Sequence, residues 1–198
     1  MKPSKRFYDL CLTLLGLSVI WPLLLALTLA VKLNDWGPVF FRQERVGFRG
    51  KTFRMWKFRT MVMNAEQMGR SITVGDDQRI TRVGAVLRKC KLDELPQLFN
   101  VIAGDMSLVG PRPEVPRYVA MYTPEQRKVL DVFPGITDPA SIQYRDENTL
   151  LAHAEDPDFT YEHEIMPTKI NINLQYAAKS SLMHDATIIV QTLSKLWR

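Results

Sequence analysis

Two adjacent carboxylates, Asp93 and Glu94, are the residues of this chain best suited to chemistry. They lie in the run Leu92–Leu98, and the basic turn Gly110–Pro113, which contains Arg112, follows closely. Acidic pairs beside fixed cations suit reactions of phosphorylated substrates, because a divalent metal can bridge the like charges of carboxylate and phosphate. The pattern therefore predicts phosphate chemistry, with Mg²⁺ held by Asp93 and Glu94.

Pro96 places Asp93 at or near the start of a helix. Proline is tolerated in a first helical turn, and the residue before it, here Leu95, avoids the α region. An N-cap position favours the ionised carboxylate, because backbone N–H groups and the helix dipole stabilise its charge. An ionised Asp93 can ligate Mg²⁺ or attack an electrophilic phosphorus. The alternative is an ordinary cap, since aspartate is among the most common N-cap residues.

Arg112 stands between two prolines, Pro111 and Pro113. The prolines fix their own backbone angles and bias their neighbours to extended forms, so Arg112 has little freedom. A preorganised cation is useful where charge develops on a phosphoryl group in transit. The alternative is that this segment only routes the chain, with Arg112 paired to a carboxylate.

Several motifs occur together and in order: Lys57–Met61, Asp77–Gly84, Leu92–Gly104, Asp105–Pro113 and Pro134–Thr137. In these motifs the chain resembles the bacterial sugar transferase family, the monotopic phosphoglycosyl transferases. The resemblance implies transfer of a sugar-1-phosphate from a UDP-sugar to polyprenyl (undecaprenyl) phosphate with release of UMP. That reaction is the first membrane step of surface glycan or glycoconjugate assembly.

The resemblance also implies roles for individual residues. Asp93 is the implied nucleophile, which forms a covalent phosphosugar intermediate, and Glu94 holds Mg²⁺ or manages the acceptor's proton. The implied substrate-binding residues are Lys57, Arg59, Arg88, Gln97, Pro111 and Arg112. Beyond Thr137 the chain departs from the commoner family pattern, so the sugar is not identified.

The segment Leu10–Val31 contains no charged residue and is long enough to span a bilayer. Pro22, near its middle, removes a backbone hydrogen bond and should bend a helix there. Basic residues flank both ends, which predicts that both ends stay in the cytoplasm. A re-entrant helix satisfies this rule, whereas a single spanning helix does not. A cleavable signal peptide is disfavoured, because no small-residue cleavage site follows.

The family resemblance likewise implies a re-entrant membrane hairpin broken at a proline. The family break is usually Ser-Pro, whereas here Trp21 precedes Pro22 and cannot accept the freed hydrogen bond. We expect residues 1–36 to form this hairpin and residues 37–198 to form a catalytic domain at the membrane surface. The expected location is the cytoplasmic face of a bacterial inner membrane.

Charge is unevenly distributed along a chain whose net charge is +5. The stretch Arg42–Arg59 holds seven Arg or Lys residues, which suits nucleic acid, anionic lipid or phosphorylated substrates. No nucleic-acid recognition motif accompanies it, so we expect no nucleic-acid partner. The acidic stretch Asp146–Glu164 is predicted to be a solvated loop or a lid. A Mg²⁺-dependent phosphohydrolase, a membrane-anchored nucleic-acid binder and a scaffold are the weaker alternatives.

The expected fold is α+β and predominantly helical, with the re-entrant helix–break–helix, amphipathic interfacial helices and a small β-hairpin. Strand character in Val39–Gln43 and Thr52–Phe58 predicts the hairpin, which would direct Lys57 and Arg59 to one face. There the two cations could grip a diphosphate, or be solvated surface charges. The oligomeric state is not indicated.

Helical periodicity predicts a helix over Thr81–Lys91, with Arg88 five residues before Asp93. An arginine fork grips phosphate oxygens, although Arg88 as a surface charge or a lipid contact is the alternative. The last helix, about Ser181–Arg198, carries an apolar stripe that would face the core or the bilayer surface. The stripe consists of Ala186, Ile189, Val190, Leu193, Leu196 and Trp197, with Asp185, Ser194, Lys195 and Arg198 beside it. A short helix over 64–69 and a loop over 71–78 complete the expectation.

Overall fold

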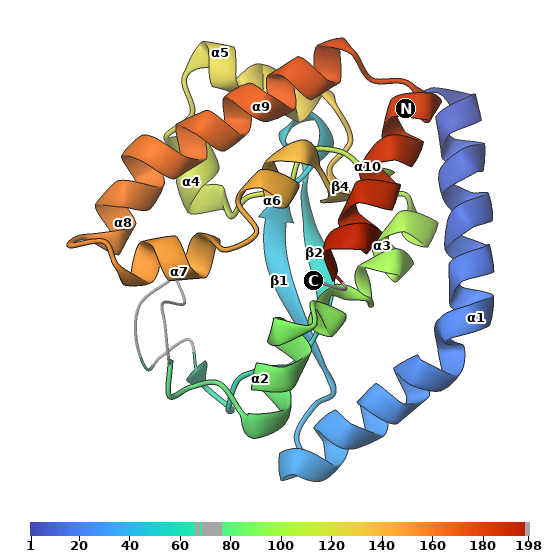
Figure 1. Ribbon diagram of the computed structural model, residues 1–198, viewed down its shortest axis with the longest axis vertical. Helices are drawn as coiled ribbons and strands as arrows, with labels where there is room; N and C mark the ends of the chain where they lie inside the picture. The colour runs from blue at the N-terminus through green and yellow to red at the C-terminus, as the bar shows by residue number, and fades with distance from the viewer. Residues whose placement is uncertain (66–67, 69–76, 197–198) are drawn as a thin grey trace.

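The computed structural model describes residues 1–65, 68 and 77–196, and these form a mainly helical structure with two small sheets (Figure 1). The helices are α1 (Pro3–Asp35), α2 (Arg82–Lys89), α3 (Gln97–Ala103), α4 (Pro116–Ala120), α5 (Pro124–Arg127), α6 (Pro139–Gln143), α7 (Glu147–Ala152), α8 (Pro157–Thr160), α9 (Met166–Ala178) and α10 (Leu182–Leu196). The strands are β1 (Phe40–Val46), β2 (Thr52–Phe58), β3 (Ser107–Val109) and β4 (Gly135–Thr137).

The predicted predominance of helix and the predicted small hairpin are confirmed. Most of the helix and loop expected over 64–78, and the chain end at 197–198, lie outside the described residues.

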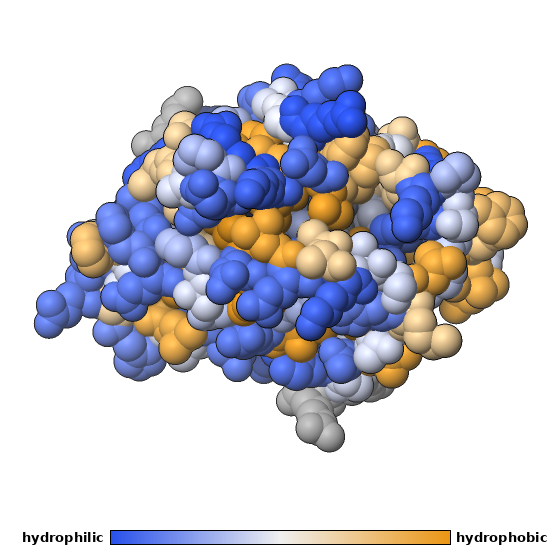
Figure 2. All heavy atoms as spheres, turned by 90° about the horizontal axis from the view of Figure 1, so that it is seen from above, coloured by the Kyte–Doolittle hydropathy of each residue, from blue (hydrophilic) through white to orange (hydrophobic). Residues whose placement is uncertain are grey.

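Helix α1 is a single apolar helix with Pro22 inside it. Of the described helices it is the one long and apolar enough to cross a membrane, by length and composition. Figure 1 shows α1 bending part way along, as expected where proline removes a backbone hydrogen bond. Many of its large apolar side chains are exposed, and Figure 2 shows apolar surface at the edge where α1 lies. Re-entrant insertion itself stays a prediction.

A buried polar network attaches the N-terminal part of α1 to the rest of the molecule. Lys5 Nζ donates to Asp185 Oδ2 of α10 at 2.6 Å, and the Tyr176 hydroxyl of α9 donates to Asp185 Oδ1 at 2.6 Å. One helical turn on, the fully buried Asp9 accepts a hydrogen bond from Ser107 Oγ of β3 at 2.7 Å. The polar residues Lys5 and Asp9 thus attach α1 to the domain just before its apolar run, Leu10–Val31, begins.

Two arginine side chains, Arg6 and Arg59, connect the two ends of α1 to the elements around the predicted site. Arg6 donates to the carbonyl of Val101 and, at 2.8 Å, to that of Ile102, near the C-terminal end of α3. The Val101 carbonyl also accepts the N–H of Gly104 at 3.1 Å, so Arg6 adds to the capping of the last turn of α3. At the other end of α1, Arg59 makes a bidentate ion pair with Asp35.

The predicted hairpin is present and positions Lys57. Strands β1 and β2 pair antiparallel, with Phe40 opposite Phe58 and Val46 opposite Thr52. Asn100 of α3 accepts a hydrogen bond from the β2 backbone at 2.9 Å and donates one back at 3.0 Å. These two bonds hold α3 against the edge of β2.

A 3₁₀ turn, Leu92–Glu94, carries the two carboxylates. The chain enters it through Lys91, whose φ of 55° is left-handed, and Leu95 is right-handed helical although it precedes Pro96. Asp93 thus lies near a helix start, as predicted, but it is not an N-cap, because Lys91 precedes the 3₁₀ turn and Pro96 precedes α3. Proline has no N–H for an α-helical bond to Leu92, so the backbone tightens into a 3₁₀ turn ahead of α3.

Parallel pairing of β3 with β4 brings the motifs Asp105–Pro113 and Pro134–Thr137 together. In β3 and β4, Ser107 lies opposite Gly135 and Val109 opposite Thr137. A Cβ atom added to Gly135 would lie 2.1 Å from the backbone nitrogen of Gly110, so the two backbones touch and no side chain fits between them. This contact fixes the point from which the segment carrying Arg112 departs.

The acidic stretch is helical, so its prediction as a solvated loop is wrong. It contains α7, α8 and a π-helical turn, Tyr161–Ile165. Asp156 caps α8 by accepting a hydrogen bond from Phe159 N at 3.1 Å, and Leu151 and Tyr161 are buried in the main hydrophobic core. Capping and apolar burial therefore outweigh the excess of acidic side chains.

In α10, the buried face differs from the predicted stripe. Asp185 and Ile188 are buried, whereas Val190 and Leu193 are exposed. The ion pair of Asp185 with Lys5 turns this face inward, because a buried carboxylate needs its partner. The exposed apolar residues leave part of α10 available for an interfacial position.

Candidate active site

Glu94 is held between two cations from separate elements. Arg112 Nη1 donates to Oε2 at 3.0 Å, Arg112 Nη2 donates to Oε1, and Lys57 Nζ of β2 donates to Oε1 at 2.9 Å. Burial raises the pKa of Glu94, but the charges and hydrogen bonds of Arg112 and Lys57 outweigh it and hold the pKa well below its ordinary value. Glu94 is therefore a fixed anion that orients both cations.

Asp93 has the opposite environment, although it is the adjacent residue. Its side chain is buried, with 8% of the residue exposed, and accepts no hydrogen bond from any described residue. Burial, and next the charge of Glu94, raise its pKa above the ordinary value, while Lys57, Arg88 and Lys91 act in the other direction. A carboxylate without hydrogen-bond partners keeps its lone pairs available for an electrophile or a metal.

Arg88 approaches Asp93 from α2. Its Nε donates to Thr60 Oγ1 at 2.9 Å, which leaves its terminal nitrogens without a partner among the described residues. Burial lowers its pKa, and the charge of Asp93 partly reverses this. Helix α2 is pressed against the end of β2, because a Cβ on Gly84 would lie 2.0 Å from the Thr60 carbonyl oxygen. The expected proximity of Arg88 to Asp93 is thus present.

Arg59 has different surroundings from the other predicted cations. Its terminal nitrogens bind Asp35, and its Nε donates to the Pro38 carbonyl at 2.6 Å. Lys57 and Arg59 therefore have separate carboxylate partners, at Glu94 and at the end of α1. A substrate-binding role for Arg59 stays a prediction.

Gln97 and Pro111 complete the predicted site residues. Gln97, in the first turn of α3, is fully buried, and neither side-chain polar atom has a partner among the described residues. Pro111 lines a hollow beside Arg112. Lys57, Arg88 and Arg112 are the predicted residues that the fold brings to the Asp93–Glu94 pair.

The donor set suits Mg²⁺ at Asp93 better than at Glu94. Mg²⁺ prefers one or two carboxylates, completed by substrate phosphates and water. Asp93 offers free oxygens, whereas those of Glu94 already bind Lys57 and Arg112. The described residues contain no cluster of three or more metal-ligating side chains. Asp93 therefore fits a metal ion that a phosphorylated substrate shares.

A second polar cluster lies beside Arg112, and no local sequence pattern pointed to it. Arg45 of β1 donates to the Pro113 carbonyl at 3.1 Å and pairs with Glu114 at 3.5 Å, and Glu114 also accepts a hydrogen bond from Tyr161. These contacts join residues 47 to 69 positions apart. Arg45 was visible in the sequence only as one member of the basic block.

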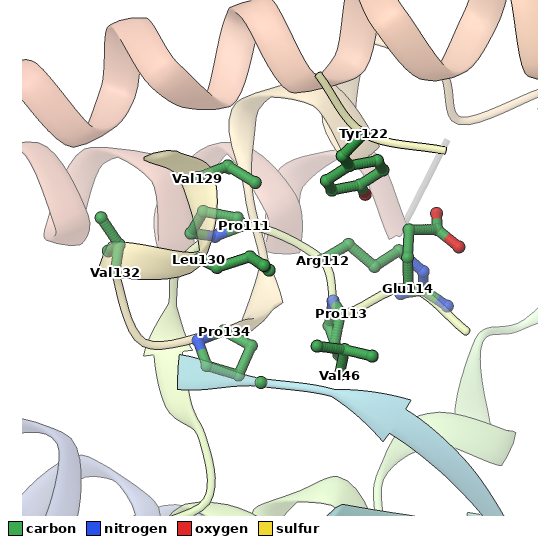
Figure 3. Close-up of a pocket in the computed structure, with 11 residues that line it drawn as sticks. Val46, Pro111, Arg112, Pro113, Glu114, Tyr122, Val129, Leu130, Val132 and Pro134 are labelled. Atoms are coloured by element: carbon green, nitrogen blue, oxygen red, sulfur yellow. The ribbon is translucent and has the colours of Figure 1, made fainter. Parts of the chain in front are cut away.

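Two adjoining hollows, together called the Arg112 hollow, open next to this cluster. Both are lined by Pro111, Arg112, Glu114, Tyr122 and Val129. The second is also lined by Met166, Lys169, Ile170 and Asn173, all from α9. Figure 3 shows Arg112, Glu114 and Tyr122 around the first hollow.

Comparison with known proteins gives consistent matches. The model of the bacterial sugar transferase family matches residues 1–198. The chain is 38% identical over 194 residues to the UDP-N-acetylgalactosamine-undecaprenyl-phosphate N-acetylgalactosaminephosphotransferase of Aeromonas hydrophila, covering 96% of this chain and 42% of that protein. It is 39% identical over 199 residues to the UDP-glucose:undecaprenyl-phosphate glucose-1-phosphate transferase of Xanthomonas campestris pv. campestris, covering 96% and 38%. The chain thus spans about two fifths of the length of these relatives. A shorter relative, the exopolysaccharide production protein ExoY of Sinorhizobium fredii, is 34% identical over 205 residues, covering 96% of this chain and 84% of ExoY.

Proposed function

This chain belongs to the bacterial sugar transferase family, and from that premise we propose that it transfers a sugar-1-phosphate from a UDP-sugar to polyprenyl phosphate. The observation that carries the proposal is the contrast between two neighbouring carboxylates. Glu94 is neutralised by two cations, whereas Asp93 is buried with free oxygens. Such an arrangement supplies one nucleophile and one organiser of phosphate-binding cations.

In the first step, an Asp93 carboxylate oxygen attacks the phosphorus that bears the sugar. A bond between that phosphorus and Asp93 forms, the bond to the bridging oxygen breaks, and UMP leaves with the electron pair. The raised pKa of Asp93 makes its carboxylate a more basic nucleophile than that of an ordinary aspartate.

In the second step, a phosphate oxygen of the polyprenyl acceptor attacks the acyl phosphate. Asp93 leaves as a free carboxylate, and polyprenyl-diphospho-sugar is the product. Dividing the transfer into two steps means that the two anionic substrates need not occupy the site together. No proton has to be moved if the acceptor reacts as the dianion.

The cations around the pair offset the phosphate charge. Arg112 and Lys57 are held in place by Glu94, and Arg88 retains free terminal nitrogens near Asp93. Cations fixed before substrate arrives do not have to reorganise as charge develops. Mg²⁺ held by Asp93 and the donor phosphates would supply further charge neutralisation.

An apolar α1 with exposed side chains suits an acceptor that cannot leave the lipid. We propose that α1 inserts as a re-entrant segment at the cytoplasmic face of the inner membrane. The two named undecaprenyl-phosphate transferases among the relatives support a lipid acceptor and a UDP-sugar donor.

The test is UMP release by protein in nanodiscs, with Mg²⁺, a panel of UDP-sugars and undecaprenyl phosphate. Wild type and Asp93→Asn are compared, with and without the acceptor. Release that requires the acceptor for turnover and disappears in Asp93→Asn supports the transferase. Release that is indifferent to the acceptor indicates a phosphohydrolase, and no release with any sugar contradicts the proposal.

A further inference from the structure

We propose that the outer side of α2 binds the headgroups of anionic phospholipids. This surface, called the α2 face, consists of Arg82, Val86 and Lys89, with Ala85 beside them. The inference rests on the insertion of α1 in a bilayer, which belongs to the proposed function, but it does not depend on the transfer reaction.

The residues of the α2 face form one stripe along the helix. Residues three, four and seven positions apart lie on the same side of an α-helix, as Arg82, Val86 and Lys89 do. All three are exposed, and the apolar Val86 is 61% exposed. An apolar side chain between two cations suits the boundary between hydrocarbon and anionic headgroups.

The opposite side of α2 packs against the membrane helix. Leu87 is buried, and together with the partly buried Val83 it belongs to a hydrophobic cluster that contains Leu24, Leu27 and Val31 of α1. Figure 1 accordingly shows α2 beside the C-terminal half of α1. The position of α2 relative to a bilayer is therefore tied to that of α1.

The C-terminal end of α1 indicates where the headgroups lie. Leu29 and Leu33 are exposed, and Trp36, which follows the helix, is 71% exposed. Tryptophan is enriched at the boundary between the hydrocarbon and the headgroups. Because α2 packs against the same half of α1, its long basic side chains lie within reach of the headgroups of the same leaflet.

The charge of this part of the chain is entirely positive. Residues 78–92 include five Arg or Lys residues and no Asp or Glu. Arg82 and Lys89, the two cations of the α2 face, form no ion pair with any described residue. Cations without acidic neighbours are attracted to an anionic surface, and a neutral surface offers them no such gain.

The α2 face is connected to the site through the helix that carries it. Arg88, on another side of α2, donates to Thr60 and lies near enough to Asp93 for each charge to affect the other's pKa. Headgroups bound at the α2 face thus hold Asp93 near the depth of the lipid phosphates. The phosphate of a lipid-bound acceptor lies at that depth.

The experiment detects the lipid next to α2 through Cys90, an exposed residue that follows the helix. The full chain with Cys11→Ser is labelled at Cys90 with a bimane fluorophore and placed in nanodiscs. Quenching is compared between phosphatidylglycerol and phosphatidylcholine that carry the same spin label near the headgroup, at equal mole fractions. Each basic residue at an anionic surface favours it roughly fivefold, so we expect phosphatidylglycerol to be enriched at the label by up to about 30-fold.

Two pairs of substitutions test whether the α2 face causes this preference. Arg82→Gln with Lys89→Gln should remove most of it. The matched control, Lys51→Gln with Lys128→Gln, removes two exposed cations from the hairpin connection and from the 3₁₀ turn Lys128–Asp131, and should retain it. Salt at about 1 M should weaken the preference in the wild type, because it screens exposed charges.

Equal quenching by the two lipids in the wild type overturns the inference. An equal loss of preference in the control pair also overturns it, since net charge alone would then attract the lipid. Protein that does not enter nanodiscs overturns both the inference and the insertion of α1. UMP release is measured on the same samples, so absent transfer with an intact lipid preference refutes the transferase and supports the α2 face.

Discussion

Replacing the two neighbouring carboxylates by their amides should change stability in opposite directions. Glu94→Gln removes the anion between Lys57 and Arg112, whose side chains are 17% and 25% exposed. Removing one partner of a buried pair costs about 3–5 kcal/mol, and we take about 3 because the cations keep some contact with water. For a chain of this length the expected fall in thermal midpoint is about 6–12 °C.

Asp93→Asn should instead leave the midpoint unchanged or raise it by about 2–4 °C, equivalent to about 1 kcal/mol. Burial and the charge of Glu94 raise the Asp93 pKa, so the folded state disfavours the ionised form that asparagine removes. The same variant should abolish UMP release, because the amide is not a nucleophile.

The assay is thermal unfolding of nanodisc-embedded protein at neutral pH, with UMP release measured on the same samples. Glu155→Gln, at an exposed residue, is the control and should shift stability by no more than about 0.5 kcal/mol. Equal losses of stability in Asp93→Asn and Glu94→Gln would refute the division of roles between the two carboxylates.

Three further predictions follow from charge and close contact. Because the folded-state pKa of Asp93 is raised, its ionisation destabilises the fold, so the stability advantage of Asp93→Asn should grow as pH rises above 3.8 in urea titrations. Gly135→Ala should destabilise the fold by about 1–3 kcal/mol and lower kcat, since its Cβ would overlap the Gly110 backbone; normal activity and stability would contradict the contact. Arg6→Met should increase hydrogen exchange at the C-terminal end of α3, which loses two side-chain donors, and unchanged exchange would argue against this connection.

Helix caps, glycine and strand propensity act over a few residues, and they determine the elements that could be predicted from the sequence. Thr81 caps α2 by accepting a hydrogen bond from Gly84 N at 2.9 Å, and Gly104 ends α3 with a left-handed φ of 91°. Strand character in Val39–Gln43 and Thr52–Phe58 likewise predicted the hairpin. In each case, the residues that determine the structure lie within a few positions of one another.

Ion pairs between residues far apart in the sequence could not be predicted from short-range patterns. Asp185 borders the apolar stripe predicted for the last helix, but its ion pair with Lys5, 180 positions away, makes it the buried centre of a network. The choice of Lys57 for Glu94 and of Arg59 for Asp35 depends on where α1 and α3 pack against β2. The two residues looked equivalent in the sequence because they are separated by only one position.

The ion pair between Lys5 and Asp185 also imposes an order on the biosynthesis of the protein. The two residues are 180 positions apart, so at about 5–20 residues per second the ribosome makes Asp185 roughly 10–40 s after Lys5. Until then Lys5 has no Asp185 to pair with, and Asp9 must likewise wait for Ser107. The apolar first helix therefore emerges long before the domain that will hold it. Its early contacts must be made with lipid or with chaperones, and docking onto the finished domain is among the last events of folding.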